Sequence, residues 1–407
     1  MRRLAVWLCI ALVFTIPWEN IVELPGIGRI SRAMGLLVAA AWVATIAASG
    51  RIRRPGPFQV LVLLFVLWNG ASLLWTVDPH ATLDRVLTYA QVFALTYIVW
   101  DTLTTLESLE LALEAYVLGA WVTAISLMWS FLAHGPAAYQ VRFTTGTFQV
   151  DDVSLILSLG IPSAWYLAVH ARGLRLVRAL RWVNFAYVPL GLVGIMLTAS
   201  RTALVSSAAG LAYIAASLPR LSWRARTLSL VLIAGLFLGL ASFVPPATVA
   251  RLGTLRASTD TTEGELNGRG PVWREAYATF QDHPLIGVGS GAFRAVNTMK
   301  VTHNFVLGFL VEIGMIGFAL FVAILGLAAW NAGRQPSGRL GLWTSVLATW
   351  LIGASLYNFQ EKKQTWLFLA LVVAGGSLVG QVVKGRAARA RRPRAALARA
   401  GGMVRGA

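Results

Sequence analysis

Long apolar runs recur along the whole chain, and they constrain its fold more than any other feature. Of the 407 residues, 57% are hydrophobic and only 13% are charged. A helix needs about 20 apolar residues to cross a hydrocarbon layer of ~30 Å, so the runs predict an all-α polytopic membrane protein with about twelve transmembrane helices. We place these helices near residues 4–17, 31–48, 57–75, 87–104, 112–132, 153–170, 182–199, 202–218, 227–244, 304–329, 340–357 and 364–383.

The first apolar run, "MRRLAVWLCIALVF", has the charged start and apolar core that are typical of a signal sequence. No A-x-A-like cleavage site follows it, so we interpret it as a retained first helix. The only cysteine, Cys9, lies in this run, and a single cysteine excludes an intramolecular disulfide.

The chain carries a net charge of +18, which taken alone would be compatible with a nucleic acid as partner. The arginines, however, lie between the apolar runs and in a basic tail at 384–407, the pattern typical of cytoplasmic loops in membrane proteins. We therefore expect no nucleic-acid partner, a helical bundle over residues 1–383, and both termini in the cytoplasm. The tail is also suited to contact with anionic membrane lipids.

With this orientation, the polar residues that hydropathy does not explain fall on the outer face of the membrane. They are Asp78, Arg142, Arg201, the long segment 245–302, and His303, which closes that segment. Ionisable groups at a membrane edge are costly and are usually functional or paired. These residues therefore point to a site, although His303 alone is also compatible with an interfacial histidine that has no chemistry.

The long outer segment is predicted to contain one short amphipathic helix. Asn267 is a suitable cap for a helix that starts near Pro271, because proline is tolerated in a first turn. One face of this helix would be apolar and would lie on the membrane or pack over the bundle, either closing the domain or facing substrate. That face consists of Val272, Trp273, Ala276 and Phe280.

Several other kinds of site are not supported by the sequence. The glycine cluster "GVGSGAF" at 287–293 lacks the strand and helix of a nucleotide loop, and we interpret it as a tight turn back to the membrane. The five histidines show no metal-ligand spacing, and the chain contains no HExxH, CxxC or GxSxG pattern. We therefore expect neither a metal nor a cofactor.

The stretch "HNFVLGFLVEIGMIG" contains four residues in a specific pattern. A histidine and an asparagine are followed by nine residues, a glycine, two residues and a second glycine, which are His303, Asn304, Gly314 and Gly317. This pattern resembles that of the O-antigen ligase family, part of a larger group of O-antigen ligases, polymerases and related oligosaccharyltransferases.

Other segments between about residues 60 and 360 are similar to that group as well. "SLLWTVDPHATLDR" resembles its Trp-Ser-x-Asp-Pro element, with Thr76 in place of serine and with Asp78 as the acid. "RFTTGTFQVDD" resembles an element that begins at Arg142, although Asp152 stands where asparagine is common. "LTASRTALVSS" is similar to its Ser-Arg element at Arg201, and "GRGPVWREAYATFQDHPLIGVGSGAF" to the segment that leads into the histidine.

The resemblance implies a GT-C-like membrane fold and a glycosyltransferase that uses lipid-linked sugars. Such an enzyme would transfer O-antigen polysaccharide from undecaprenyl diphosphate to lipid A–core at the periplasmic face of the inner membrane. It would need no nucleotide sugar, ATP or metal. The alternatives are an O-antigen or exopolysaccharide polymerase, a protein oligosaccharyltransferase, or a non-enzymatic flippase; a transporter would place ionisable residues through the midplane.

The chemistry of this transfer asks for arginine and histidine. A diphosphate leaving group is already anionic, and planar guanidinium groups bind it and stay charged near lipid. Arg201, Arg269 and Arg142 are the outer-face candidates, with Arg274 as the competitor of Arg269. His303 would take the proton of the acceptor hydroxyl or contact phosphate, and a one-step displacement would invert the anomeric centre.

The remaining candidates have supporting roles. Asn304 would orient His303 or cap the following helix, and Gly314 and Gly317 would permit close helix packing. Asp78 belongs to this supporting set. We interpret Glu312, one acid within an apolar run, as a group paired inside the bundle and not as a catalytic residue.

Overall fold

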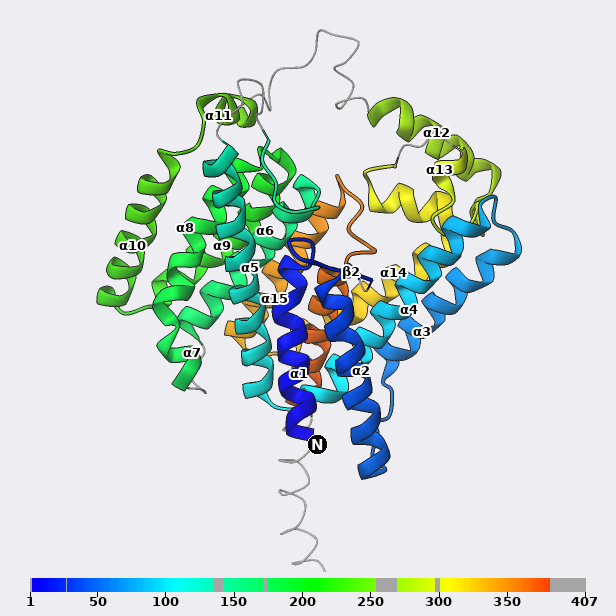
Figure 1. The fold of residues 1–407 in the computed structure, drawn as a ribbon, viewed down its shortest axis with the longest axis horizontal. Helices are drawn as coiled ribbons and strands as arrows, with labels where there is room; N and C mark the ends of the chain where they lie inside the picture. The colour runs from blue at the N-terminus through cyan, green and yellow to red at the C-terminus, as the bar shows by residue number, and fades with distance from the viewer. Residues whose placement is uncertain are drawn as a thin grey trace, which may run out of the picture.

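A computed structural model describes residues 2–26, 28–134, 142–170, 175–253, 269–296 and 301–380, and nearly all of this chain is helical. The helices stand side by side in one bundle (Figure 1). They are α1 Arg2–Thr15, α2 Ile30–Ser49, α3 Pro57–Ala71, α4 Pro79–Thr102, α5 Leu106–His134, α6 Val150–Val169, α7 Arg175–Ala179, α8 Arg181–Leu197, α9 Arg201–Ser217, α10 Trp223–Ala241, α11 Pro246–Gly253, α12 Arg269–Asp282, α13 Phe293–Val296, α14 Phe305–Gly333, α15 Ser337–Ala354 and a last helix, Lys363–Gly380.

Each apolar run that the sequence predicts as a span coincides with one helix of the bundle. Eight helices of the described chain are long and apolar enough to cross a membrane, fewer than the twelve predicted. The other four predicted spans are α1 and α8, which are shorter, and α4 and α15, which are less apolar. The prediction of an all-α polytopic membrane protein is confirmed, whereas the count of spans depends on these four.

The loops contain short elements that the sequence did not reveal. Three 3-10 turns, η1 Ile16–Trp18, η2 Ser72–Leu74 and η3 Leu218–Arg220, follow helix ends, and α7, α11 and α13 interrupt long connections. The strands β1 Glu23–Leu24 and β2 Gly28–Arg29 form a small antiparallel hairpin. All of these pieces are too short to give a periodic sequence signal.

The amphipathic helix predicted near Pro271 is α12, which begins at Arg269. Its apolar face packs over α14, because Val272 and Ala276 are buried with Phe293 and Val311. The helix therefore covers the bundle instead of lying free on the membrane. The predicted cap Asn267 and the basic tail at 384–407 lie outside the described residues.

The core of the bundle is centred on α6 and the last helix, which are mostly buried, while few residues of α2 and α10 are fully buried. A cluster of aromatic rings packs α14 against α3 and the last helix. The Phe65 ring of α3 lies 5.8 Å from the rings of Phe309 and Phe321, and 5.7 Å from Trp366 of the last helix. Each such pair adds about 0.5–1.5 kcal/mol beyond the area it buries, so the start of α14 is firmly positioned.

Helix α14 is broken at Gly314, whose backbone lies at φ 66° and ψ −174°. The glycine-rich turn at 284–291 crosses this break and takes up the backbone groups it frees. The Met315 amide donates to the Pro284 carbonyl, and the Gly289 amide to the Glu312 carbonyl, each at 2.9 Å. A broken helix is tolerated at membrane depth only where protein covers its backbone, and here the turn does so.

Replacing Gly314 by alanine is expected to destabilise the bundle. A Cβ at this residue would lie 2.2 Å from the Leu285 carbonyl oxygen, and a positive φ costs a non-glycine residue about 1–3 kcal/mol. The matched control is Gly326→Ala in the same helix, where nothing lies within 4 Å of the new Cβ. Thermal unfolding of the purified protein in detergent should show a lower midpoint for Gly314→Ala only. Equal midpoints for the two variants would contradict this account of the break.

Candidate active site

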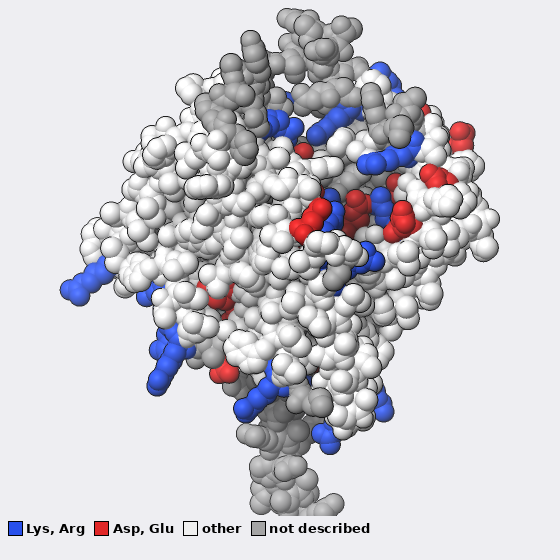
Figure 2. All heavy atoms as spheres, viewed as in Figure 1, with Lys and Arg blue, Asp and Glu red and all other residues white. Residues whose placement is uncertain are grey.

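Polar residues from distant parts of the chain converge at the end of the bundle that carries α12 and α13, away from the N-terminus (Figure 1). Figure 2 shows basic and acidic side chains gathered in a hollow there, while most of the flank carries no charge. The hollow includes a cavity of about 250 Å³. Its lining is Arg85, Gln149, Gly291, Phe293, Arg294, Val301, Thr302, His303, Glu312, Tyr357, Asn358, Glu361 and Lys362.

His303 reaches this cavity from a strained position just before α14. Its φ is 47°, in the left-handed region that costs most residues energy. Hydrogen bonds fix the residues on both sides of His303 and so stabilise this conformation. Trp273 Nε1 donates to the Thr302 carbonyl at 2.6 Å, and Asn304 Oδ1 accepts from the Val306 amide at 2.9 Å. Asn304 therefore caps α14, one of its two predicted roles.

The imidazole of His303 is set up to stay neutral. Burial lowers its pKa, and the positive charges of Arg269 and Arg294 lower it further against the opposing carboxylate of Asp151. The ring lies 5.2 Å from the ring of Tyr357, and its buried Nδ1 has no hydrogen-bond partner among the described residues. A neutral imidazole with a free lone pair can accept a proton near pH 7.

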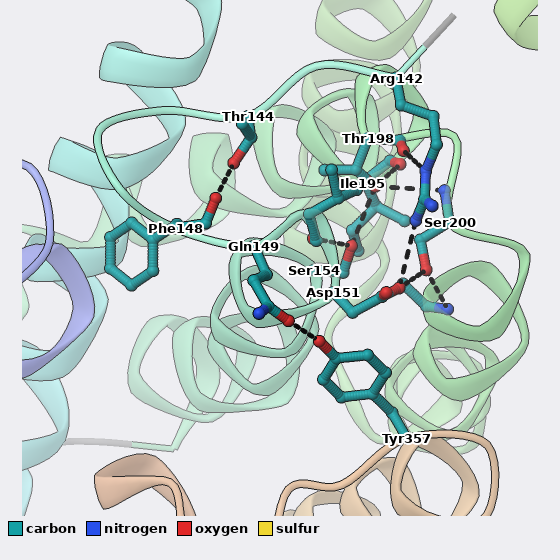
Figure 3. Close-up of polar contacts among 12 residues, drawn as sticks. Arg142, Thr144, Phe148, Gln149, Asp151, Ser154, Ile195, Thr198, Ser200 and Tyr357 are labelled. Atoms are coloured by element: carbon teal, nitrogen blue, oxygen red, sulfur yellow. Dashed lines mark hydrogen bonds and ion pairs between the residues drawn. The ribbon is translucent and has the colours of Figure 1, made fainter. Parts of the chain in front are cut away.

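Arg142 and Ser200, the residue just before Arg201, meet at a shared acid, Asp151, at the start of α6 (Figure 3). The Asp151 carboxylate accepts a hydrogen bond of 2.9 Å from the Ser200 hydroxyl and pairs with Arg142 at 3.4 Å. Ser200 in turn caps α9, since its oxygen accepts from the Ala203 amide at 3.3 Å. Arg201 is the first residue of α9, so this contact places its backbone beside Arg142.

Arg269, the first residue of α12, is the third cation of the cluster. Burial lowers its pKa, and the neighbouring charges of Arg142 and Arg201 lower it as well, against Asp151 and Tyr357. Guanidinium groups stay charged under such shifts, and their mutual effect means that they lie close together. The structure thus unites the three arginines predicted from separate segments.

The loop at 355–362 between α15 and the last helix is a part of the site that sequence reasoning missed. Its Tyr357 hydroxyl donates to Gln149, and its Lys362 pairs with Asp152 at 2.9 Å. Glu361 forms an ion pair with Arg85 of α4. The signal was present, because "NFQEKK" is a polar interruption between two apolar runs on the predicted outer side.

Part of the chain that includes the candidate site matches a known protein family. Residues 186–322 match the O-antigen ligase family. The matched segment runs from α8 to the middle of α14 and contains Arg201, Arg269 and His303. The resemblance inferred from the sequence is confirmed over this segment. No curated protein matches the chain.

Glu312 lies in the same cavity as His303, beside Arg85, and receives a hydrogen bond from the Gly291 backbone. Its charged partners agree with the predicted pairing. That Glu312 lines the same cavity as His303 was not foreseen from the sequence.

The other supporting candidates of the O-antigen ligase pattern shape the scaffold. Asp78 caps α4, with its Oδ1 accepting from the Ala81 amide at 3.1 Å, and it does not line the cavity. Gly314 approaches the turn at Leu285 and not another helix, and a Cβ on Gly317 would meet Ile313 of its own helix at 2.5 Å. The predicted close helix packing is therefore replaced by contacts within α14 and its covering turn.

Two further points concern the charges of this O-antigen ligase segment. Arg274, the predicted competitor of Arg269, is exposed on α12, whereas Arg269 is partly buried; neither side chain lines the cavity. Within the described ranges, no group of three or more His, Cys, Asp or Glu side chains is arranged to hold a metal ion. The cationic side chains that line the cavity are Arg85, Arg294 and Lys362.

The titration of His303 should depend on Arg269. Its pKa lies below the ordinary value near 6.5, so the imidazole is neutral at pH 7 and charges only as the pH falls below 6.5. Arg269→Gln removes one charge that lowers this pKa, so the pKa should rise. NMR of ¹⁵N-histidine-labelled protein in detergent measures the pKa of His303 in wild type and in Arg269→Gln. Arg274→Gln is the control, which should leave the pKa of His303 unchanged. A wild-type pKa above 6.5 would overturn the neutral-base interpretation.

Proposed function

We propose that this protein is an O-antigen ligase, which transfers O-antigen polysaccharide from undecaprenyl diphosphate to a sugar hydroxyl of lipid A–core. The observation that carries the proposal is that Arg269 acts electrostatically both on His303 and on the neighbouring Arg142 and Arg201, so the histidine lies beside a group of arginines at one end of the bundle. The match of residues 186–322 to the O-antigen ligase family supports the same reaction class. The reaction would take place at the periplasmic face of the inner membrane, where the outer-face prediction puts this end of the bundle.

The arginine cluster would bind the diphosphate of the donor. Its leaving oxygen gains negative charge as the bond to the anomeric carbon breaks, and nearby guanidinium groups stabilise that charge without a proton transfer. Arg142 is oriented by Asp151, while Arg201 and Arg269 each start a helix, where the backbone dipole also favours an anion. The exposed apolar flank beside the site would leave the polyprenyl chain in the lipid.

His303 would act on the acceptor. The neutral imidazole takes the proton of the acceptor hydroxyl, whose oxygen attacks the anomeric carbon from the face opposite the diphosphate. The new glycosidic bond forms as the old carbon–oxygen bond breaks, and its electron pair leaves on the diphosphate. One displacement inverts the anomeric centre, and such base catalysis contributes typically ~10²–10⁴-fold.

The cavity beside His303 is the natural place for the acceptor sugar. Glu312 and Glu361 offer carboxylate oxygens to sugar hydroxyl groups, and Arg85 and Lys362 offer donors for acidic or phosphorylated sugars. The volume of about 250 Å³ fits one sugar unit, so the rest of a core glycan would extend outward from the membrane end.

Alanine replacement of His303 or Arg201 should each nearly abolish transfer. His303→Ala removes the base and should lower the rate by ~10²–10⁴-fold. Arg201→Ala removes charge from the diphosphate site and should lower the rate by about 10²-fold or more. Transfer of polymer to core in membranes expressing each variant is the measurement. Arg224→Ala, an exposed arginine on α10 far from the cavity, is the matched control and should keep wild-type activity.

Deletion of the gene separates a ligase from the runner-up, a polymerase that uses the same donor. A ligase deletion leaves lipid A–core without O-antigen, while polymer accumulates on undecaprenyl diphosphate. A polymerase deletion leaves core that carries a single repeat unit. Lipopolysaccharide on a gel distinguishes the patterns, and the single-repeat pattern would replace the ligase assignment by the polymerase.

A further inference from the structure

A second cavity lies at the opposite end of the bundle, near α7 in Figure 1. It measures about 380 Å³ and is enclosed by the end of α6, by α7, by the start of α8, by η3 and by the start of α10. None of these residues belongs to the candidate active site. The sequence prediction places this end on the cytoplasmic side.

Three arginines face the cavity from three different elements. Arg178 comes from α7, Arg181 from α8 and Arg220 from η3. No acidic residue of the described chain forms an ion pair with any of them. The Nε of Arg181 is buried and has no hydrogen-bond partner among the described residues. Three like charges around one hollow repel one another, so an anion bound among them would be favoured electrostatically.

The backbone adds to the same positive field. Helix α8 begins at Arg181 without a side-chain cap, and α10 begins just after Ser222, whose hydroxyl oxygen accepts from the Ala225 amide, also at the cavity. The dipole of a helix N-terminus favours negative charge, phosphate in particular. Ser222 also brings a hydroxyl group to the rim.

The surroundings of the arginines are those of a lipid headgroup site. Leu167, Leu221 and Ala225 give the cavity an apolar wall. Trp182 and Trp223 are 49% and 71% exposed at the starts of α8 and α10, where indole rings favour the membrane–water interface. A ligand here would place its charged part on arginine and an apolar part along the exposed surface of α10.

We propose that this cavity binds a phosphate group, and that the phosphate is the headgroup of an anionic membrane lipid. Basic pockets between membrane helices are suited to such headgroups, with the phosphate on arginine and the acyl chains in the bilayer. The site is separate from the glycan transfer proposed above, and it would anchor the α7–α10 side of the bundle to the membrane.

Lipid binding to the purified full-length protein tests this site. Native mass spectrometry gives the dissociation constants of phosphatidylglycerol, of phosphatidylcholine and of inorganic phosphate. Loss of each arginine is expected to raise the dissociation constant of phosphatidylglycerol about fivefold. The double variant Arg181→Gln with Arg220→Gln should therefore raise it about 25-fold. Arg220→Gln alone, in a short surface turn, provides the test should the double variant fail to fold.

Arg224→Gln is the matched control, because it removes the same charge from an exposed residue of α10 outside the cavity. Its dissociation constant for phosphatidylglycerol should stay within about twofold of the wild-type value, because a single charge that faces solvent contributes little. If the double variant binds inorganic phosphate more weakly than wild type does, and phosphatidylglycerol binds wild type no more tightly than inorganic phosphate does, the anion site is supported. Its ligand is then free phosphate and not a lipid headgroup. Equal binding of phosphatidylglycerol to wild type and double variant, or equal binding of phosphatidylcholine, would overturn the proposal.

Discussion

The candidate site depends on one anion, the carboxylate of Asp151, which lies among Arg142, Arg269 and His303. It pairs with Arg142, accepts from Ser200 at the start of α9, and opposes the pKa shifts of Arg269 and His303. The adjacent Asp152 pairs with Lys362. Two neighbouring acids at the start of α6 therefore connect this helix to Arg142 on one side of the candidate site and to Lys362 on the other.

The break in α14 is the second constraint on which the site depends. A Cβ at Gly314 would lie 2.2 Å from the Leu285 carbonyl oxygen, so a larger residue would obstruct the glycine-rich turn. Because Gly314 adopts a positive φ, the turn at 284–291 can bond to residues 311–316, and the α13 residues that follow it line the cavity with His303. Gly314 thus belongs to the scaffold of the cavity and does not line it.

Much of the site was predictable because its residues break the apolar pattern on one face of the membrane. His303, Arg142, Arg201 and Arg269 each stand out in this way, and the structure brings them together. Tyr357 and Glu361 were not predicted. Their loop is short and polar, and only the packing of the last two helices against α6 and α4 shows that it faces the histidine.

The sequence by itself determined the class of the fold, the positions of the helices and the chemical character of the outer end, because hydropathy and rare ionisable residues are local properties of the chain. Only the tertiary structure decided that Arg142 and Arg201 lie near Arg269, that Asp151 pairs with Arg142, and that Glu312 lines the cavity of His303. It also joined Tyr357 to Gln149, which are 208 positions apart. A single sequence carries no signal for pairs that meet only when helices pack.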